Sequence, residues 1–282
     1  MNSPSSLRLI APAKINLFLH ITGKRQDGYH DLQSLVCFAD FGDEIIIEPC
    51  DKFSFIQTGK LVEGDNIIIK AANAIATATN QSLNCKITLN KNIPIGAGLG
   101  GGSSNAATII KGLLKFWQVK EPESIHEILY NLGADVPCCY HGKSCYFEGI
   151  GDVITPVSLP SNLYAVLINP NKHCATKDIF QKIKPPYHPI ISLPKSFENQ
   201  DQLIRFLKQQ DNDMTLPAIH QVPDIKNILD YLSAQPNTIL TRMSGSGATC
   251  FALTSTKEQT ETLTQQIQSD HPEWWVQAVK LK

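Results

Sequence analysis

Apolar and polar residues alternate along the first fifty positions, which is typical of strands with one buried face. The pattern predicts a short strand over 7–11 that Pro12 ends, followed by a second strand over 13–21. Two more strands are expected over 35–39 and 44–48. We interpret Asp40-Phe41-Gly42 between them as a turn.

Three side chains share one face of the second predicted strand: Lys14, Asn16 and Phe18. A lysine and an asparagine in that arrangement can be solvated, or they can line a polar site. The strand pattern does not decide between these two interpretations. The segment over 22–29 contains two glycines and several charged residues, which predicts an exposed loop that ends at Tyr29.

From residue 67 on, the spacing of apolar residues in two segments is that of helices. A helix is expected over 67–78, capped by Asp65-Asn66, and a second over 123–132. Pro137 disfavours helical geometry at Val136, so we expect the second helix to have ended and Asp135 to lie at a helix-to-strand corner.

A proline-rich change in composition over 156–162 marks a boundary, which predicts two domains, 1–158 and 159–282. The second half predicts alternating elements that suit an α+β sandwich. Its strands are expected over 164–168, 238–240, 249–253 and 275–279, and its helices over 175–182, 199–209, 223–233 and 257–268. The stretch 185–194 is rich in proline and predicts an irregular segment.

One stretch stands out between a strand pattern over 85–89 and a helix pattern over 105–117. It runs Pro94-Ile95-Gly96-Ala97-Gly98-Leu99-Gly100-Gly101-Gly102-Ser103-Ser104, and five of its eleven residues are glycine. Ser103 or Ser104 is placed to cap the helix that follows. Glycines allow the backbone to approach a ligand, and a helix N-terminus attracts anions, so this pattern predicts a phosphate-binding loop.

Three common phosphate-loop motifs do not fit. A Walker A loop ends in Gly-Lys-Ser/Thr, but here Gly102 is followed directly by Ser103. The Gly-x-Gly-x-x-Gly spacing matches a dinucleotide fingerprint, yet Glu121, at the distance of its acidic partner, falls in a loop pattern. The Asp-Phe-Gly triplet precedes the glycine stretch, whereas in protein kinases it follows.

Composition narrows the class of protein further. The chain has 282 residues, 42% hydrophobic and 18% charged, with a net charge of −1, which disfavours nucleic-acid or membrane binding through basic patches. It has eight cysteines without a Cys-x-x-Cys pair, so we expect reduced thiols and a cytoplasmic location. The chain contains no run of 18 apolar residues, and nothing predicts a signal peptide.

Taken together, these motifs resemble the GHMP kinases. The glycine stretch is similar to their ATP-binding motif, and Gly245-Ser246-Gly247-Ala248, which predicts a second phosphate-facing loop, is similar to their C-terminal glycine motif. Three further segments resemble the branch that phosphorylates the 2-hydroxyl of 4-diphosphocytidyl-2-C-methyl-D-erythritol in non-mevalonate isoprenoid biosynthesis. They are Pro12-Ala13-Lys14-Ile15-Asn16-Leu17, Asp27-Gly28-Tyr29-His30 and Leu132-Gly133-Ala134-Asp135-Val136-Pro137.

The resemblance implies an α+β fold of two domains, the first like domain 2 of ribosomal protein S5 and the second ferredoxin-like. It implies ATP as phosphoryl donor, with Mg²⁺ expected and its ligands unknown. It assigns catalysis to Asp135 and Lys14, and ATP binding to Pro94–Ser104 with Lys91 and Asn66. The residues implied at the acceptor are Asn16, Tyr29, His30, Thr176 and Phe180, with Tyr29 and Phe180 stacking on cytosine.

Two alternatives remain open at this point. Another GHMP small-molecule kinase, of the mevalonate, homoserine or galactose type, is disfavoured by the residues at Tyr29-His30 and Phe180. A non-catalytic nucleotide or RNA binder on an S5-like fold is disfavoured by the near-neutral charge and by the Lys14/Asp135 pair. We expect a small-molecule acceptor and neither nucleic acid nor membrane as partner; the sequence does not predict an oligomeric state.

Overall fold

The computed structural model describes residues 6–59 and 66–282, which form two compact units. The first unit is drawn from Met1–Ala13, Phe41–Ile95 and Gly100–Gly142, and the second from Lys14–Asp40, Gly96–Leu99 and Lys143–Lys282. The paired strands β1 (Leu7–Lys24) and β2 (His30–Pro49) each contribute residues to both units. These units do not test the division into domains 1–158 and 159–282, which stays a prediction.

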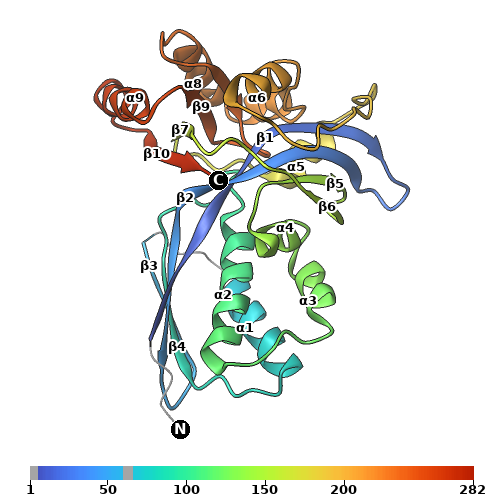
Figure 1. The fold of residues 1–282 in the computed structure, drawn as a ribbon, viewed down its shortest axis with the longest axis vertical. Helices are drawn as coiled ribbons and strands as arrows, with labels where there is room; N and C mark the ends of the chain where they lie inside the picture. Colours follow the sequence, from blue (N-terminus) through green and yellow to red (C-terminus); the bar gives the residue numbers. More distant parts are fainter. Residues whose placement is uncertain (1–5, 60–65) are drawn as a thin grey trace. The chain divides into compact units, whose positions relative to one another are not determined.

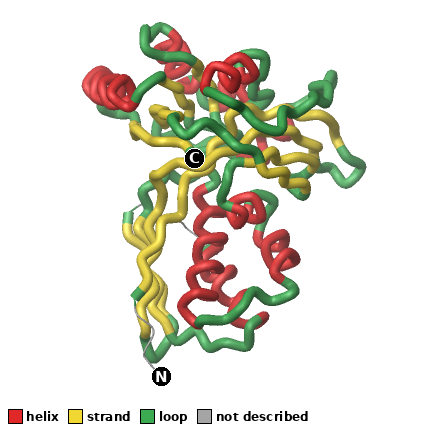
Figure 2. The backbone as a smooth tube through the Cα atoms, in the orientation of Figure 1, coloured by secondary structure: helices red, strands yellow, loops and turns green. Residues whose placement is uncertain are grey.

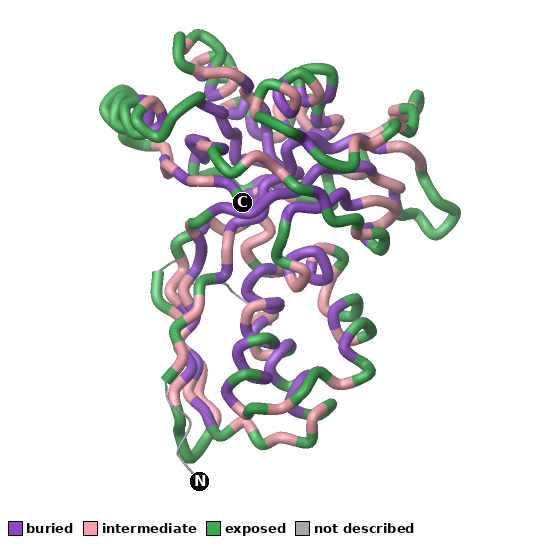
Figure 3. The backbone as a smooth tube through the Cα atoms, in the orientation of Figure 1, coloured by how far each residue is buried: buried purple, intermediate pink, exposed green. Residues whose placement is uncertain are grey.

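In the first unit, helices pack against one face of a small sheet (Figures 1 and 2). Strand β4 (Cys85–Asn90) pairs antiparallel with Glu44–Pro49 of β2 and parallel with β3 (Ser54–Thr58). Helix α1 (Ile67–Ala78) packs against α2 (Gly101–Trp117), and their buried faces are purple in Figure 3. Two shorter helices, α3 (Ile125–Leu132) and α4 (Val136–His141), pack against each other and against α2.

The second unit is built on an antiparallel sheet. Its strand order continues from β2 through β10 (Trp275–Leu281), β7 (Leu163–Asn169) and β9 (Cys250–Thr254) to β8 (Leu240–Met243). Strand β5 (Cys145–Gly149) pairs with β2 and with β6 (Val153–Pro156). The helices of this unit are α5 (Thr176–Lys182), α6 (Gln200–Leu207), α7 (Thr215–Gln221), α8 (Asp224–Ser233) and α9 (Lys257–Asp270).

The two predicted breaks in the N-terminal strands are wrong, because β1 runs through Pro12 and β2 runs through Asp40-Phe41-Gly42 without a turn. A Cβ atom at Gly42 would lie 2.0 Å from the Ala11 carbonyl oxygen. Glycine is therefore required at this position for the close approach of β1, and not for chain reversal.

Two helix boundaries also differ from expectation. The N-cap of α2 is Gly100, in the left-handed conformation and without a side-chain cap, so Ser103 and Ser104 lie inside the first turn and cap nothing. Asp135 precedes helix α4 and not a strand, because Pro137 sits in the first turn, where a missing N–H is tolerated. The structure confirms Asn66 as the cap of α1, while Asp65 lies outside the described residues.

Three short elements, β3, α4 and α7, were not predicted from the pattern. Most other predicted elements of the second half are present within a few residues, and 185–194 is irregular as expected. The strand expected over 238–240 begins only at Leu240, as β8. The eight cysteines are all free thiols, and seven are buried.

Candidate active site

The first part of the glycine stretch, Gly96–Leu99, is held by its carbonyl groups. The carbonyl of Ala97 accepts a hydrogen bond from Thr249 N (3.1 Å), that of Gly98 from Ser244 Oγ (3.1 Å), and that of Leu99 from Lys14 N (2.9 Å). A Cβ atom at Gly98 would lie 2.4 Å from the Ser244 carbonyl oxygen. The two glycine turns predicted from the sequence therefore pack directly on each other.

This arrangement determines where the N–H groups of the loop point. In a trans peptide the C=O and N–H point in opposite directions, so three fixed carbonyls turn the next three N–H groups away from these partners. Those N–H groups belong to Gly98, Leu99 and Gly100, and none has a hydrogen-bond acceptor among the described residues. Gly96, Gly98 and Gly100 have positive φ angles of 63°, 72° and 61°. A run of N–H groups that lack an acceptor among the described residues, with alternating left-handed residues, can bind an anion.

The remaining ATP-binding candidates of this stretch, Gly101, Gly102, Ser103 and Ser104, form the first turn of α2. This helix has 17 residues, so its N-terminus carries the full positive end of a helix dipole. Gly101 is helical and has no positive φ, so its glycine is not required by backbone conformation. Pro94 and Ile95 lie just before the carbonyl-held turn.

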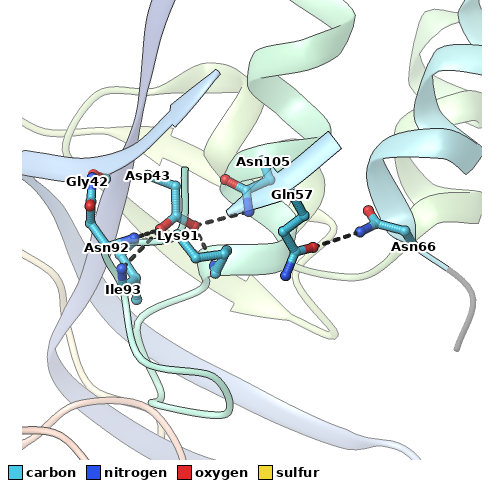
Figure 4. Close-up of polar contacts among 8 residues, drawn as sticks. All are labelled: Gly42, Asp43, Gln57, Asn66, Lys91, Asn92, Ile93 and Asn105. Atoms are coloured by element: carbon cyan, nitrogen blue, oxygen red, sulfur yellow. Dashed lines mark hydrogen bonds and ion pairs between the residues drawn. The ribbon is translucent and has the colours of Figure 1, made fainter. Parts of the chain in front are cut away.

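Lys91, an ATP-binding candidate, is buried in an ion pair with Asp43, and the two side chains are 6% and 0% exposed. Figure 4 shows Lys91, Asn92 and Ile93 converging on the Asp43 carboxylate. Asn66, the second such candidate, accepts from Ile68 N (2.9 Å) and donates to Gln57 Oε1 (3.2 Å). Both ends of its amide are therefore engaged within the protein.

Lys14 and Asn16 are buried, at 4% and 1% exposed, so the interpretation of a solvated strand face is wrong. The ammonium of Lys14 lies 5.7 Å from the ring centroid of Phe147 on β5. Asn16 donates from Nδ2 to Ser34 Oγ (2.8 Å), but its Oδ1 is buried and has no hydrogen-bond partner among the described residues. A buried acceptor without a partner indicates a place where a ligand can donate.

The aromatic candidates group around one imidazole. His30 stacks on Phe180, with ring centroids 5.3 Å apart, and Tyr187 meets His30 edge-on at 6.3 Å. Burial, together with Lys24, lowers the pKa of His30, so its ring is neutral at neutral pH. The buried Nε2 of His30 has no partner within the described residues. Tyr29 next to it is 62% exposed and stacks on neither ring.

Thr176 and Asp135, the other two candidates, begin helices. Thr176 opens α5 and its Oγ1 lies 2.7 Å from Ser246 Oγ, in the second glycine turn. Asp135 directly precedes α4, which packs against the glycine-rich helix α2 within the first unit. The exposed Thr176 is therefore joined to a phosphate-loop candidate by a hydrogen bond.

Sequence reasoning missed three residues of this region: Asp43, Asn105 and Ser244. Ser244 Oγ donates to Gly98 O and accepts from Asn16 N (3.1 Å), so it joins the loop to an acceptor candidate. The sequence carried no clear signal for Asp43, because it lies between the two predicted strands and among other acidic residues, Asp40 and Glu44.

Two family models match this chain: the GHMP kinases N terminal domain over residues 66–143 and the GHMP kinases C terminal domain over residues 192–273. A relative from Paramagnetospirillum magneticum, called 4-diphosphocytidyl-2-C-methyl-D-erythritol kinase, is 37% identical over 98% of this chain and 99% of its own. The chain belongs to the GHMP kinase family. A relative of the same name from Cereibacter sphaeroides is 38% identical, over 96% of this GHMP kinase and 98% of its own chain.

A solved structure has the same fold as this GHMP kinase. The crystal structure of 4-(cytidine 5'-diphospho)-2C-methyl-D-erythritol kinase superimposes with a TM-score of 0.82 at 26% identity, covering 98% and 99% of the two chains. The predicted family, phosphotransferase activity and α+β GHMP fold are therefore confirmed. None of the described helices is long and apolar enough to cross a membrane.

Proposed function

We propose that this GHMP kinase transfers the γ-phosphoryl group of ATP to the 2-hydroxyl of 4-diphosphocytidyl-2-C-methyl-D-erythritol, in non-mevalonate isoprenoid biosynthesis. The observation that carries the proposal is near full-length similarity to relatives of that name, at 37–38% identity. We also keep a cytoplasmic location as a proposal, which the free, mostly buried thiols support.

The donor end of the proposed reaction uses the glycine stretch. Three N–H groups of Gly98, Leu99 and Gly100, together with the N-terminus of α2, would hold the ATP phosphates. Phosphoryl transfer depends mainly on positioning and charge stabilisation, which fixed backbone dipoles supply without reorganisation. Lys91 and Asn66 are proposed to lie near the nucleotide.

Mg²⁺ would accompany ATP and neutralise charge that develops on the transferred phosphoryl group. The described residues contain no cluster of three or more His, Cys, Asp or Glu side chains that could hold a metal ion. Mg²⁺ keeps several waters and binds through substrate phosphates with few protein ligands. The Asp43 carboxylate already accepts four hydrogen bonds and has no capacity left for a metal.

At the acceptor end, Asp135 is proposed to accept the hydroxyl proton and Lys14 to hold the hydroxyl and steady the nearby charge. Asn16 Oδ1 and His30 Nε2, both buried and unpartnered among the described residues, are suited to bind polar groups of the acceptor. Phe180 and Tyr29 would stack on the cytosine, which contributes about 1–3 kcal/mol per base.

The test is phosphate transfer from radiolabelled ATP to a panel of the cytidyl methylerythritol, mevalonate and homoserine. We expect transfer to the cytidyl compound alone, and Asp135→Asn should lower kcat by about 10²–10⁴-fold while ATP still binds. Transfer to mevalonate or homoserine at a comparable kcat/KM would reject the proposed acceptor. Asp135→Asn activity within threefold of wild type would reject its role as base.

A further inference from the structure

Asp43 is a buried carboxylate to which neither the sequence nor the proposed reaction gives a role. It lies on β2 and is 0% exposed. Four donors converge on it: Lys91 Nζ, Asn92 N (2.8 Å), Ile93 N (2.8 Å) and Asn105 Nδ2 (3.0 Å). An ionised carboxylate offers about four acceptor sites, so Asp43 is saturated by the protein itself.

All four donors flank the phosphate loop (Figure 4). Lys91, Asn92 and Ile93 form the segment that leads from β4 into the glycine stretch, and Asn105 lies in α2, just after it. Asp43 thus ties the entrance of the loop to the helix that follows its exit.

The position of the Lys91 ammonium gives this contact a consequence for ligand binding. A Cβ atom on Gly101 would lie 3.4 Å from Lys91 Nζ, so the ammonium sits against the first residue of α2. There its charge adds to the positive end of the helix dipole. A lysine ammonium has three donors, and Asp43 uses one, which leaves donors for an anion at the helix N-terminus.

An isolated lysine with a long flexible side chain would not stay in such a place. Burial of an unpaired charge is costly, and free rotation of the side chain would carry the ammonium to water. The Asp43 carboxylate removes both effects, since it compensates the charge and fixes the side chain.

We propose that Asp43 is a positioning residue for ATP, which acts by holding the Lys91 ammonium at the N-terminus of α2. The proposal rests on the proposed function of the glycine stretch as the ATP site. Asp43 does not touch the nucleotide; its effect on the phosphates passes through Lys91.

The experiment is a double-mutant cycle of Asp43→Asn, Lys91→Met and the double variant. Kd for a non-hydrolysable ATP analogue is measured by calorimetry, and KM for ATP and for the acceptor by steady-state kinetics. Asp43→Asn should raise the analogue Kd and KM for ATP about tenfold and leave KM for the acceptor within twofold. Because Asp43 acts through Lys91, the double variant should bind the analogue as weakly as Lys91→Met alone.

Glu44→Gln is the matched control, since Glu44 is the next residue on β2 and its carboxylate is also paired, with Arg8 and Asn90. It removes one negative charge without touching the loop and should leave the analogue Kd unchanged. Equal losses in Asp43→Asn and Glu44→Gln would show a general effect of charge and overturn the proposal.

Three further outcomes test the role of Asp43 and the proposed function. A folded Asp43→Asn with a lower melting temperature but an unchanged analogue Kd would reduce Asp43 to a structural role and overturn the proposal. Should Asp43→Asn not fold, the charge-balanced double variant replaces it, and a Kd more than threefold above that of Lys91→Met would overturn the proposal. Failure of the wild-type protein to bind the analogue would instead reject the proposed function.

Discussion

The carboxylate of Asp43 and the two acceptor candidates Asn16 and His30 are all buried but differ in how their polar atoms are satisfied. Asp43 accepts four hydrogen bonds from the protein, whereas Asn16 Oδ1 and His30 Nε2 accept or donate none within the described residues. A saturated buried group holds structure together, and an unsatisfied one costs stability unless a ligand completes it. This contrast is the one we expect between a residue that shapes a site and residues that meet its ligand.

The largest expected effect tests the saturated side of this contrast. Asp43→Ala leaves the Lys91 ammonium buried without its partner, and we expect a loss of about 3–5 kcal/mol in unfolding free energy. Asn16→Ala removes one hydrogen bond to Ser34 but also an unsatisfied oxygen, so its loss should stay within about 1 kcal/mol. Denaturant unfolding of both variants makes the comparison. Similar losses for the two would refute the contrast.

The same contrast exists within one loop, where the carbonyls of Ala97, Gly98 and Leu99 are satisfied, whereas the N–H groups that follow have no acceptor in residues 6–59 and 66–282. Gly98→Ala places a Cβ 2.4 Å from a backbone oxygen, which must turn the loop. We expect ATP affinity to fall about 100-fold. This corresponds to about 3 kcal/mol of binding free energy, since each tenfold change in Kd is worth about 1.4 kcal/mol.

Gly142→Ala is the control for that loss. Gly142 also has a positive φ, 69°, but the nearest contact of its Cβ would be an ordinary 3.5 Å. It should lower the melting temperature without changing ATP affinity in calorimetry. Unchanged ATP affinity in a folded Gly98→Ala would exclude this turn as the phosphate cradle.

A smaller effect is expected at the rings beside His30. Tyr29→Ala and Phe180→Ala should each raise KM for the cytidyl acceptor by roughly 5- to 150-fold, the equivalent of about 1–3 kcal/mol of stacking, with KM for ATP nearly unchanged. The exposed Tyr29 should lose no thermal stability, whereas Phe180, which packs against the core of the second unit, should lose some. If KM for both substrates rose equally in Tyr29→Ala, the stacking assignment would be wrong.

The smallest effect concerns a third unsatisfied buried atom, His20 Nδ1, which no proposed site uses. His20 stacks on His188 (3.6 Å) near Asp213, Asp211 and Arg242, and burial lowers its pKa from 6.5 to about 4. The unfolded chain therefore binds the proton more tightly, so stability falls as pH drops from above 6.5 toward 4.

Melting temperatures at pH 7.5 and pH 5 check this prediction. His20→Gln cannot take up the proton, so its melting temperature should fall less between the two pH values than that of the wild type. Parallel losses in the two proteins would mean that other groups carry the acid sensitivity.

Much of the fold was predictable because its elements are marked locally, as in the cap at Asn66 and the apolar faces of α1 and α2. The glycine stretch was predictable for the same reason. The errors at Gly42 and Asp43 have another origin: both residues serve partners far along the chain, the first Ala11 and the second Asn105, 62 positions away. A periodic pattern reports which face is buried, but not which distant group meets it.

The carbonyl-held turn has a further consequence, for how far the proposed nucleotide site depends on distant parts of the chain. A Walker-type loop is contained in one strand–loop–helix segment. Here the turn over 96–99 is anchored by Lys14 on β1, by Ser244 and by Thr249, three positions spread across most of the sequence. A peptide cut from the glycine stretch would lose the anchors that orient its N–H groups, so we do not expect the motif to be portable to another protein.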